Sequence, residues 1–173
     1  PNVLVLDYFC YRVEDGAWDG PEEVLSVDKT VREDVGLPLR GGQMVQPWMQ
    51  DKQGGGTSAD LELSCTFAVE QPPDGDVYLA MEQPGRFAVT LNGHPIPTEA
   101  ECGWWVDRSL RLIPIDPAIL KKGVNELRLD GTYDSRAGLE TMFLLGDFTV
   151  DLDGNEATLR RASRPGFGDW TQE

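Results

Sequence analysis

The stretch that decides the fold is residues 77–133, which reads VYLAMEQPGRFAVTLNGHPIPTEAECGWWVDRSLRLIPIDPAILKKGVNELRLDGTY. Residues 77–82 and 86–91 are rich in aromatic and β-branched side chains, a composition typical of strands. Asn92-Gly93 follows at once, and this pair supplies the two positive φ angles of a type I′ turn. The stretch therefore predicts short consecutive strands joined by a tight hairpin, with the return strand beginning at Ile96.

Outward from this stretch, residues 61–69 (LELSCTFAV) alternate with period two, so every second side chain from Leu61 to Val69 shares one face. This pattern predicts a half-buried strand. Further strand candidates are residues 2–13, 109–115, 125–130, 142–150 and 157–162. The runs at 2–13 and 142–150 are apolar enough to lie inside a sheet.

Two short helices are predicted. Residues 26–36 form the longer one, with Ser26 or Asp28 as its N-cap and Gly36 as its terminator. Residues 116–123 form a single turn that starts at an Asp-Pro pair and ends at a glycine. With so little helix and no alternation of strands and helices, we expect an all-β fold, an antiparallel β-sandwich of the jelly-roll type.

The length of 173 residues fits one domain with its own core, so residues 1–173 are expected to form a single β-sandwich domain. The chain begins abruptly at Pro1 and stops in a polar Trp-Thr-Gln-Glu. We therefore expect the domain to be excised from a larger multidomain protein.

The charge balance narrows the choice of partners. Thirty acidic and fifteen basic residues give a formal net charge of −15, which repels phosphate backbones and anionic membrane surfaces. No nucleic acid and no membrane is expected as a partner, and no apolar run approaches the length of a membrane span. A neutral glycan or a protein surface fits this charge better than a polyanionic polysaccharide.

The three cysteines are Cys10, Cys65 and Cys102. They cannot all pair within one chain, and their spacing fits no zinc site. Their apolar settings predict buried small hydrophobic side chains, and one disulfide remains the alternative.

Several motifs occur in a distinctive order: Phe67, Leu91-Asn-Gly93, Trp105-Val-Asp107 and Leu120-Lys-Lys-Gly-Val-Asn-Glu126. Through them, residues 61–133 resemble the sugar-binding jelly roll of the β-galactosidase and β-glucuronidase family, within the galactose-binding-domain-like group. Nearly the whole chain is similar to non-catalytic regions of large bacterial glycoside hydrolases, rhamnosidase-like enzymes included. The segments that carry this second likeness are NVLVLDY at 2–8, QPW at 46–48, GWWVD at 103–107, LLGDF at 144–148 and GDW at 168–170.

The resemblance implies an accessory module that accompanies a separate catalytic barrel. It implies an extracellular or periplasmic location, with a cytoplasmic one as the alternative. The ligand does not carry over, because such modules bind different sugars or none.

The first candidates for contact with a glycan are Trp104, Trp105, Asp107 and Arg108. An indole offers a flat apolar face to sugar C–H groups, and the flanking charged groups can bind hydroxyls. Adjacent strand residues point to opposite faces, so one tryptophan or both are alternatively core residues. Trp48 is a further candidate ligand-binding residue, and Trp18 and Trp170 are secondary candidates.

A structural calcium ion is the one cofactor that the resemblance implies as an option. Asp151, Asp153 and Asn155 place oxygen side chains at alternate positions, as calcium loops do, but the full twelve-residue pattern is missing. The alternative is that Asp153-Gly154 forms a hairpin turn between two strands.

We expect no catalytic residues and no enzymatic activity in this chain. His94 is the only histidine and lies beside a hairpin turn without a nucleophile motif. Glycoside hydrolysis needs two carboxylates across a cleft, for which Glu82, Asp107, Asp134 and Glu140 are available. The favoured function is a non-catalytic carbohydrate-binding module of a glycoside hydrolase, and the alternative is a structural module that packs against the catalytic domain without binding sugar.

Overall fold

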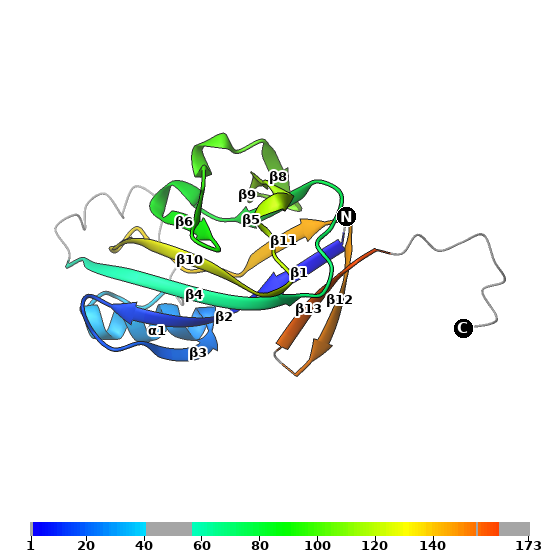
Figure 1. Cartoon of the computed structure of the whole chain (residues 1–173). Coiled ribbons are helices and arrows are strands. Elements are labelled where there is room, and N and C mark those ends of the chain that lie inside the picture. The colour runs from blue at the N-terminus through cyan, green and yellow to red at the C-terminus, as the bar shows by residue number, and fades with distance from the viewer. Residues whose placement is uncertain (1, 41–56, 155, 163–173) are drawn as a thin grey trace.

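The strands of this chain build two sheets that pack face to face, as Figure 1 shows for the computed structural model. The structure describes residues 2–40, 57–154 and 156–162. The five-stranded sheet has the order β1 (Asn2–Leu6), β11 (Met142–Gly146), β5 (Val77–Met81), β9 (Asp107–Ile115) and β8 (Gly103–Trp105). The all-β sandwich that the sequence predicts is confirmed.

The eight-stranded sheet is built around the long pair formed by β4 and β10. Its main order is β12 (Phe148–Asp153), β13 (Glu156–Arg161), β4 (Ala59–Val69), β10 (Gly123–Tyr133), β6 (Ala88–Leu91) and β7 (His94–Ile96). Beside it, β2 (Tyr8–Val13) pairs with β4 and β3 (Asp19–Glu23). Among the described strands one pair is parallel, that of β13 with β4, and the other pairs are antiparallel, in agreement with the predicted antiparallel sandwich.

Two runs that look like single strands in the sequence each split at one aspartate. Residues 2–13 form β1 and β2, which break at Asp7 and lie in different sheets. Residues 142–150 are likewise divided between β11 and β12, with the break at Asp147. The predictions that these runs lie inside a sheet fail for β1 and β12, because each is an edge strand. Both corners carry the chain from one sheet to the other and so close the sandwich.

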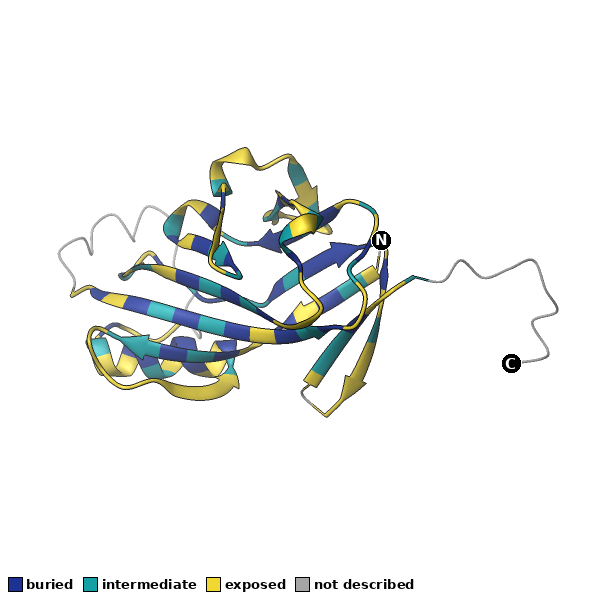
Figure 2. Cartoon of the chain, viewed as in Figure 1, coloured by how far each residue is buried: buried dark blue, intermediate teal, exposed yellow. Residues whose placement is uncertain are grey.

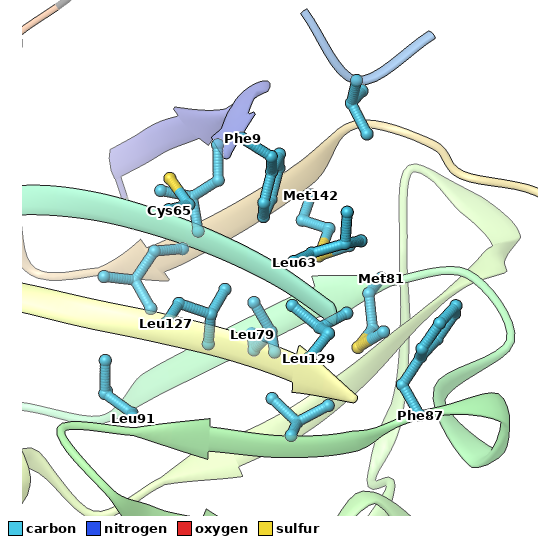
Figure 3. Packing of buried hydrophobic residues seen from close by; sticks show 14 of the residues in the cluster. Phe9, Leu63, Cys65, Leu79, Met81, Phe87, Leu91, Leu127, Leu129 and Met142 are labelled. Carbon is cyan, nitrogen blue, oxygen red and sulfur yellow. The ribbon is translucent and has the colours of Figure 1, made fainter. Parts of the chain in front are cut away.

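The core lies between the sheets. The predicted alternation of β4 is confirmed, because Leu61, Leu63, Cys65, Phe67 and Val69 are all buried. In Figure 3, Leu63 on β4 and Leu127 and Leu129 on β10 pack among the same side chains as Leu79 and Met81 on β5. Each such leucine contributes about 1.5–3 kcal/mol by leaving water. Figure 2 shows the resulting alternation of buried and exposed positions along these strands.

The motifs Asn92-Gly93 and Gly-Val-Asn-Glu form one hydrogen-bonded unit. Asn92 and Gly93 both have positive φ, as the type I′ turn requires. The fully buried Asn125 side chain accepts from the backbone N–H of Lys121 at 2.9 Å and from Asn92 Nδ2 at 2.7 Å. Its own Nδ2 donates to the carbonyl oxygens of Lys121 and Gly123, at 2.7 and 3.0 Å. All of its hydrogen-bonding capacity is used, which fixes the connection from β9 to β10 across the two sheets.

The return strand of this hairpin begins at His94, two residues before the predicted Ile96. The predicted single turn is present as the 3₁₀ helix η4 (Pro117–Ile119), where Asp116 accepts from the N–H of Ala118 at 2.9 Å. Two further 3₁₀ turns are η2 (Pro84–Arg86) and η3 (Thr98–Ala100).

The helix α1 (Val24–Val35) ends at Gly36 in the left-handed region, as predicted. Its N-cap is Glu23, which accepts from the N–H of Ser26 at 3.1 Å, so the predicted caps Ser26 and Asp28 are wrong. Asp28 is instead buried, and its carboxylate accepts from Arg32, from the Tyr133 hydroxyl and from the N–H of Leu139. This charge ties the helix to β10 and to the loop before β11.

The cysteines do not share one environment. All three are free thiols, of which Cys65 is buried, Cys10 is half-buried and Cys102 is exposed. The prediction of buried hydrophobic side chains is confirmed for Cys65 and wrong for Cys102. Burial raises the pKa of the Cys65 thiol to about 12.

Candidate functional site

Trp104 and Trp105 lie next to each other on β8 but in different surroundings. Trp104 is 51% exposed, while Trp105 is half-buried and its ring centroid lies 5.1 Å from that of Phe143. A register shift separates the two residues, and Val106 follows with a φ of 60°. Neither tryptophan belongs to the core cluster, so the alternative that at least one fills the core is wrong.

The contact with Phe143 shows where the Trp105 ring lies. Phe143 is on β11, which is separated from β8 by β9 and β5 in the order of the sheet. The ring must therefore extend across the outer face of the five-stranded sheet, the face turned away from the core. Ala80 on β5 pairs with Phe143 and with Leu112, and it is fully buried although it lies outside the core cluster. A small side chain at this position leaves room for the rings above it.

An open cavity of about 340 Å³ lies beside these rings. Its lining combines three carboxylates, two hydroxyls and two apolar side chains: Glu82, Asp107, Glu140, Ser109, Thr141, Leu110 and Phe143. The residues come from the end of β5, the start of β9, the start of β11 and the loop before it. The apolar wall beside acceptor groups is the composition of a site for a polar organic molecule.

Hydrogen bonds hold the carboxylates in place. The Ser109 hydroxyl donates to Glu82 at 2.8 Å, and the Ser109 N–H donates to Asp107 at 2.8 Å. The bond from the Ser109 backbone lowers the pKa of Asp107 below its ordinary value, so this carboxylate is ionised at neutral pH. Glu140 forms an ion pair with Arg40. The cavity thus presents a fixed, ionised acceptor next to an aromatic wall.

The structure brings together part of the predicted site. Asp107 lines the cavity together with Glu82 and Glu140, two of the carboxylates considered for hydrolysis. Trp105 is not part of the lining and adjoins it through its ring contact with Phe143. Asp134 lies elsewhere, 3.1 Å from Arg86 and hydrogen-bonded to the backbone of its own loop.

Other candidates do not line the cavity. Trp104 and Arg108 are exposed on the same β8–β9 hairpin but are not part of the lining, and Trp48 and Trp170 lie outside the described residues. Trp18 contacts the eight-stranded sheet instead. The guanidinium groups of Arg12 and Arg128 lie 5.2 and 5.3 Å from its ring centroid.

Phe143 lines the cavity, and the sequence did not single it out. Residues 142–145 are continuously apolar, so no alternation marks which side chains face outward. The pairing of Phe143 with Ala80 would identify it, but this pairing is known only from the register of β11 with β5.

Two of the three candidate calcium ligands, Asp151 and Asp153, lie in the described part of the chain. Asp151 and Asp153 are exposed on β12, and Asp151 is 2.7 Å from Arg160. Asp153 pairs with Glu156 across the turn at Gly154, which confirms the hairpin; Asn155 lies outside the described residues. In residues 2–40, 57–154 and 156–162, no group of three or more His, Cys, Asp or Glu side chains could hold a metal ion.

His94 is exposed at the start of β7.

A second cavity of about 540 Å³ lies at α1 and is lined by Leu25, Asp28, Lys29, Leu39, Arg40 and Glu140. Its central carboxylate, Asp28, is already bound by Arg32, Tyr133 and Leu139, which gives it a structural role.

No protein-family model matches this chain, and neither a curated protein nor a solved structure is similar to it at a significant level. Within the described part of the chain, no helix is both long and apolar enough to cross a membrane. The interpretation of the site therefore depends on its own geometry.

Proposed function

We propose that this chain is a non-catalytic carbohydrate-binding module, with the connectivity of a galactose-binding-like jelly roll, and that it serves a bacterial glycoside hydrolase outside the cytoplasm. The observation that carries the proposal is the aromatic pair Trp105 and Phe143 beside a cavity lined with carboxylates and hydroxyls. The sequence resemblance adds the expectation of a separate catalytic domain.

Sugar chemistry fits this arrangement. The apolar face of a pyranose packs against an aromatic ring, while its hydroxyl groups donate hydrogen bonds. An ionised carboxylate forms hydrogen bonds about twice as strong as a neutral acceptor does, and the cavity offers Asp107 in a fixed position. Glu82, held by the Ser109 hydroxyl, is a further acceptor. The net charge of −15 favours a neutral glycan over a polyanionic one.

Fluorescence titration tests this proposal, because Trp105 is an intrinsic reporter at the cavity. The isolated domain is titrated with a panel of neutral mono- and oligosaccharides, with and without calcium. We expect a saturable change with at least one sugar. Trp105→Ala lacks this reporter, so its binding is measured by calorimetry, and it is expected to weaken binding at least about tenfold, equivalent to about 1.4 kcal/mol. Asp107→Asn should weaken it too.

Trp104→Ala is the matched control, since it removes the neighbouring indole and leaves the ring pair of Trp105 and Phe143 intact. Binding that is lost in the Trp104 variant and kept in the Trp105 variant would contradict the proposed site. A silent panel with a folded protein would contradict sugar binding altogether.

The second candidate function is a structural module that packs against a catalytic domain and binds no sugar. It is favoured by the apolar outer face of the five-stranded sheet, where Val5 is 47% exposed and Phe143 and Leu112 are half-buried. A silent sugar panel together with tight association of this domain with a catalytic domain, broken by Val5→Lys, would support this alternative.

A further inference from the structure

The strand β1 forms one edge of the five-stranded sheet, and its only paired strand among those described is β11. Its register is regular, with Asn2 opposite Gly146 and Leu4 opposite Leu144. The Val3 N–H donates to the exposed Asn2 side chain at 3.0 Å, so it points away from β11.

In a strand, the N–H and C=O of one residue point to the same side, and the side alternates along the chain. The outward groups of β1 are therefore those of Val3 and Val5, while Asn2, Leu4 and Leu6 bond to β11. These outward N–H and C=O groups have the arrangement that accepts another strand.

The other edges of the two sheets carry features that prevent such pairing. β8 has three residues and a register shift, and β7 has three residues that include Pro95. β3 contains Pro21 and three acidic residues, and β12 carries Asp151 and Asp153. Short length, proline, irregularity and charge are the usual means by which proteins block edge pairing. β1 has none of them, because its five residues are uncharged, contain no proline and keep one register.

The side chains of β1 define what a strand added to it must carry. Val3 and Val5 lie on the outer face, and Leu4 and Leu6 are buried toward the core. Residues of an added strand would alternate between these two faces, so apolar side chains at every second position would extend one of them. The exposed Asp147 lies next to Gly146, which pairs with Asn2, and the whole chain carries −15. Basic residues are therefore favoured in the added strand, and acidic ones are repelled.

We infer that the outward edge of β1 is a docking site for an extended segment of a partner protein, about five to seven residues long, apolar at alternate positions and basic between them. The main-chain groups of Val5 and the Val3 C=O supply affinity, the Val3 N–H exchanges its exposed Asn2 acceptor for the added strand, and the alternating side chains supply register. A second copy of this chain is a poorer occupant, because two molecules of charge −15 repel each other. The inference is independent of the sugar site.

The test uses four synthetic peptides of seven residues, capped at both ends and labelled with a fluorophore. The first has valine at alternate positions with lysine and threonine between them, and the second replaces lysine by glutamate. The third and fourth are the lysine peptide N-methylated at every second amide, in the two possible phases. Binding is measured by anisotropy, and exchange of the Val3 and Val5 amide hydrogens is followed by NMR.

We expect saturable binding of the lysine peptide, at least about tenfold weaker binding of the glutamate peptide, and about tenfold slower exchange at both amides. One N-methylated peptide should bind and the other should fail, because only one phase places methyl groups toward β1. Since the methyl groups are on the peptide, this result does not depend on whether a protein variant folds. In the protein, Val5→Pro removes the outward N–H and should abolish binding, whereas Val5→Thr keeps the N–H and should retain it.

The inference is overturned if the lysine peptide does not bind, if both N-methylated peptides bind equally, or if the two amides are already protected in the free domain at low concentration. Protection that appears only as protein concentration rises would assign the edge to a second copy and would overturn the choice of a partner strand.

Discussion

The two outer faces of the sandwich differ sharply in chemistry. On the eight-stranded sheet, Glu62 accepts from Arg12 and Arg128, and Ser64 donates to Glu126 at 2.7 Å. On the five-stranded sheet, the register places two rows of mainly apolar side chains on the outer face: Val5, Phe143, Ala80 and Leu112 in one row, and Val3, Leu145, Tyr78 and Pro114 in the other. The side chains of the first face are paired with one another, whereas the second face exposes apolar surface, since Val5 is 47% exposed although Ala80 and Leu145 are buried.

The position of the tryptophans follows the same division. Trp18 contacts two guanidinium groups on the charged face, an arrangement that is stable while exposed to water. Trp105 extends over the apolar face and contacts Phe143, which lines the cavity. An antiparallel sheet with one polar and one buried face is the common case, so the apolar outer face of the five-stranded sheet is the exception that points to function.

The largest expected effect comes from removing Asn125, whose hydrogen bonds fix the connection from β9 to β10 between the two sheets. Asn125→Ala should lower the free energy of unfolding by about 3 kcal/mol, since it leaves several buried backbone and side-chain groups without partners at about 1–3 kcal/mol each. Urea denaturation followed by circular dichroism measures this. The exposed Lys122→Ala is the control, expected to change stability by less than about 0.5 kcal/mol. A loss below about 1 kcal/mol for Asn125→Ala would show that the connection carries little stability.

A second prediction compares one tryptophan from each face. Trp105→Ala should cost about 2 kcal/mol, because it removes a half-buried ring from Phe143 and uncovers Ala80. Trp18→Ala should cost about 0.5–1 kcal/mol, the value of a cation–π contact at an exposed site. Urea denaturation of both variants in parallel gives the two costs. Equal costs would remove the proposed energetic difference between the faces.

Local signals in the sequence predicted the elements that neighbouring residues determine. The period-two alternation of β4, the Asn92-Gly93 hairpin and the Asp116-Pro117 turn are of this kind, since each is specified within a few residues. The breaks at Asp7 and Asp147 were missed, because a corner of one residue leaves the apolar run on either side unchanged. The split between sheets depends on which strands pair, and pairing is a long-range property.

The candidate site shows the same limit. Trp105 and Asp107 were identified because the residue types and their spacing suggest glycan contact. Phe143, Glu82 and Glu140 complete the cavity from parts of the chain that are distant in sequence, so nothing local marks them as neighbours. The burial of Asp28 was missed for the same reason, since the hydroxyl that it accepts from belongs to Tyr133.

A third prediction concerns the charged face alone. Glu62→Gln should lower stability by about 0.5–1 kcal/mol at low salt, because it leaves Arg12 and Arg128 without their shared carboxylate on a surface open to solvent. The loss should shrink markedly in about 0.5 M NaCl, where exposed charges are screened over a few ångströms. The cost of Trp105→Ala should be nearly insensitive to the same salt. Denaturation of both variants at two salt concentrations checks this, and a salt-independent cost at Glu62 would contradict an electrostatic origin.

The smallest expected effect is the acid titration of Asp107 at the rim of the apolar face. Hydrogen bonds from Ser109 hold its pKa below the usual 3.8, so the folded state favours the ionised form. A carboxylate with a depressed folded pKa stabilises the protein above its unfolded pKa, and this contribution is lost as pH falls through the lower, folded value. We therefore expect sugar binding to be constant from pH 7 to about pH 4 and to decline only below that. Titration of the Asp107 side-chain carbon signal by NMR, alongside binding at each pH, decides the point: a midpoint above 4 would show that the Ser109 hydrogen bonds do not persist in solution.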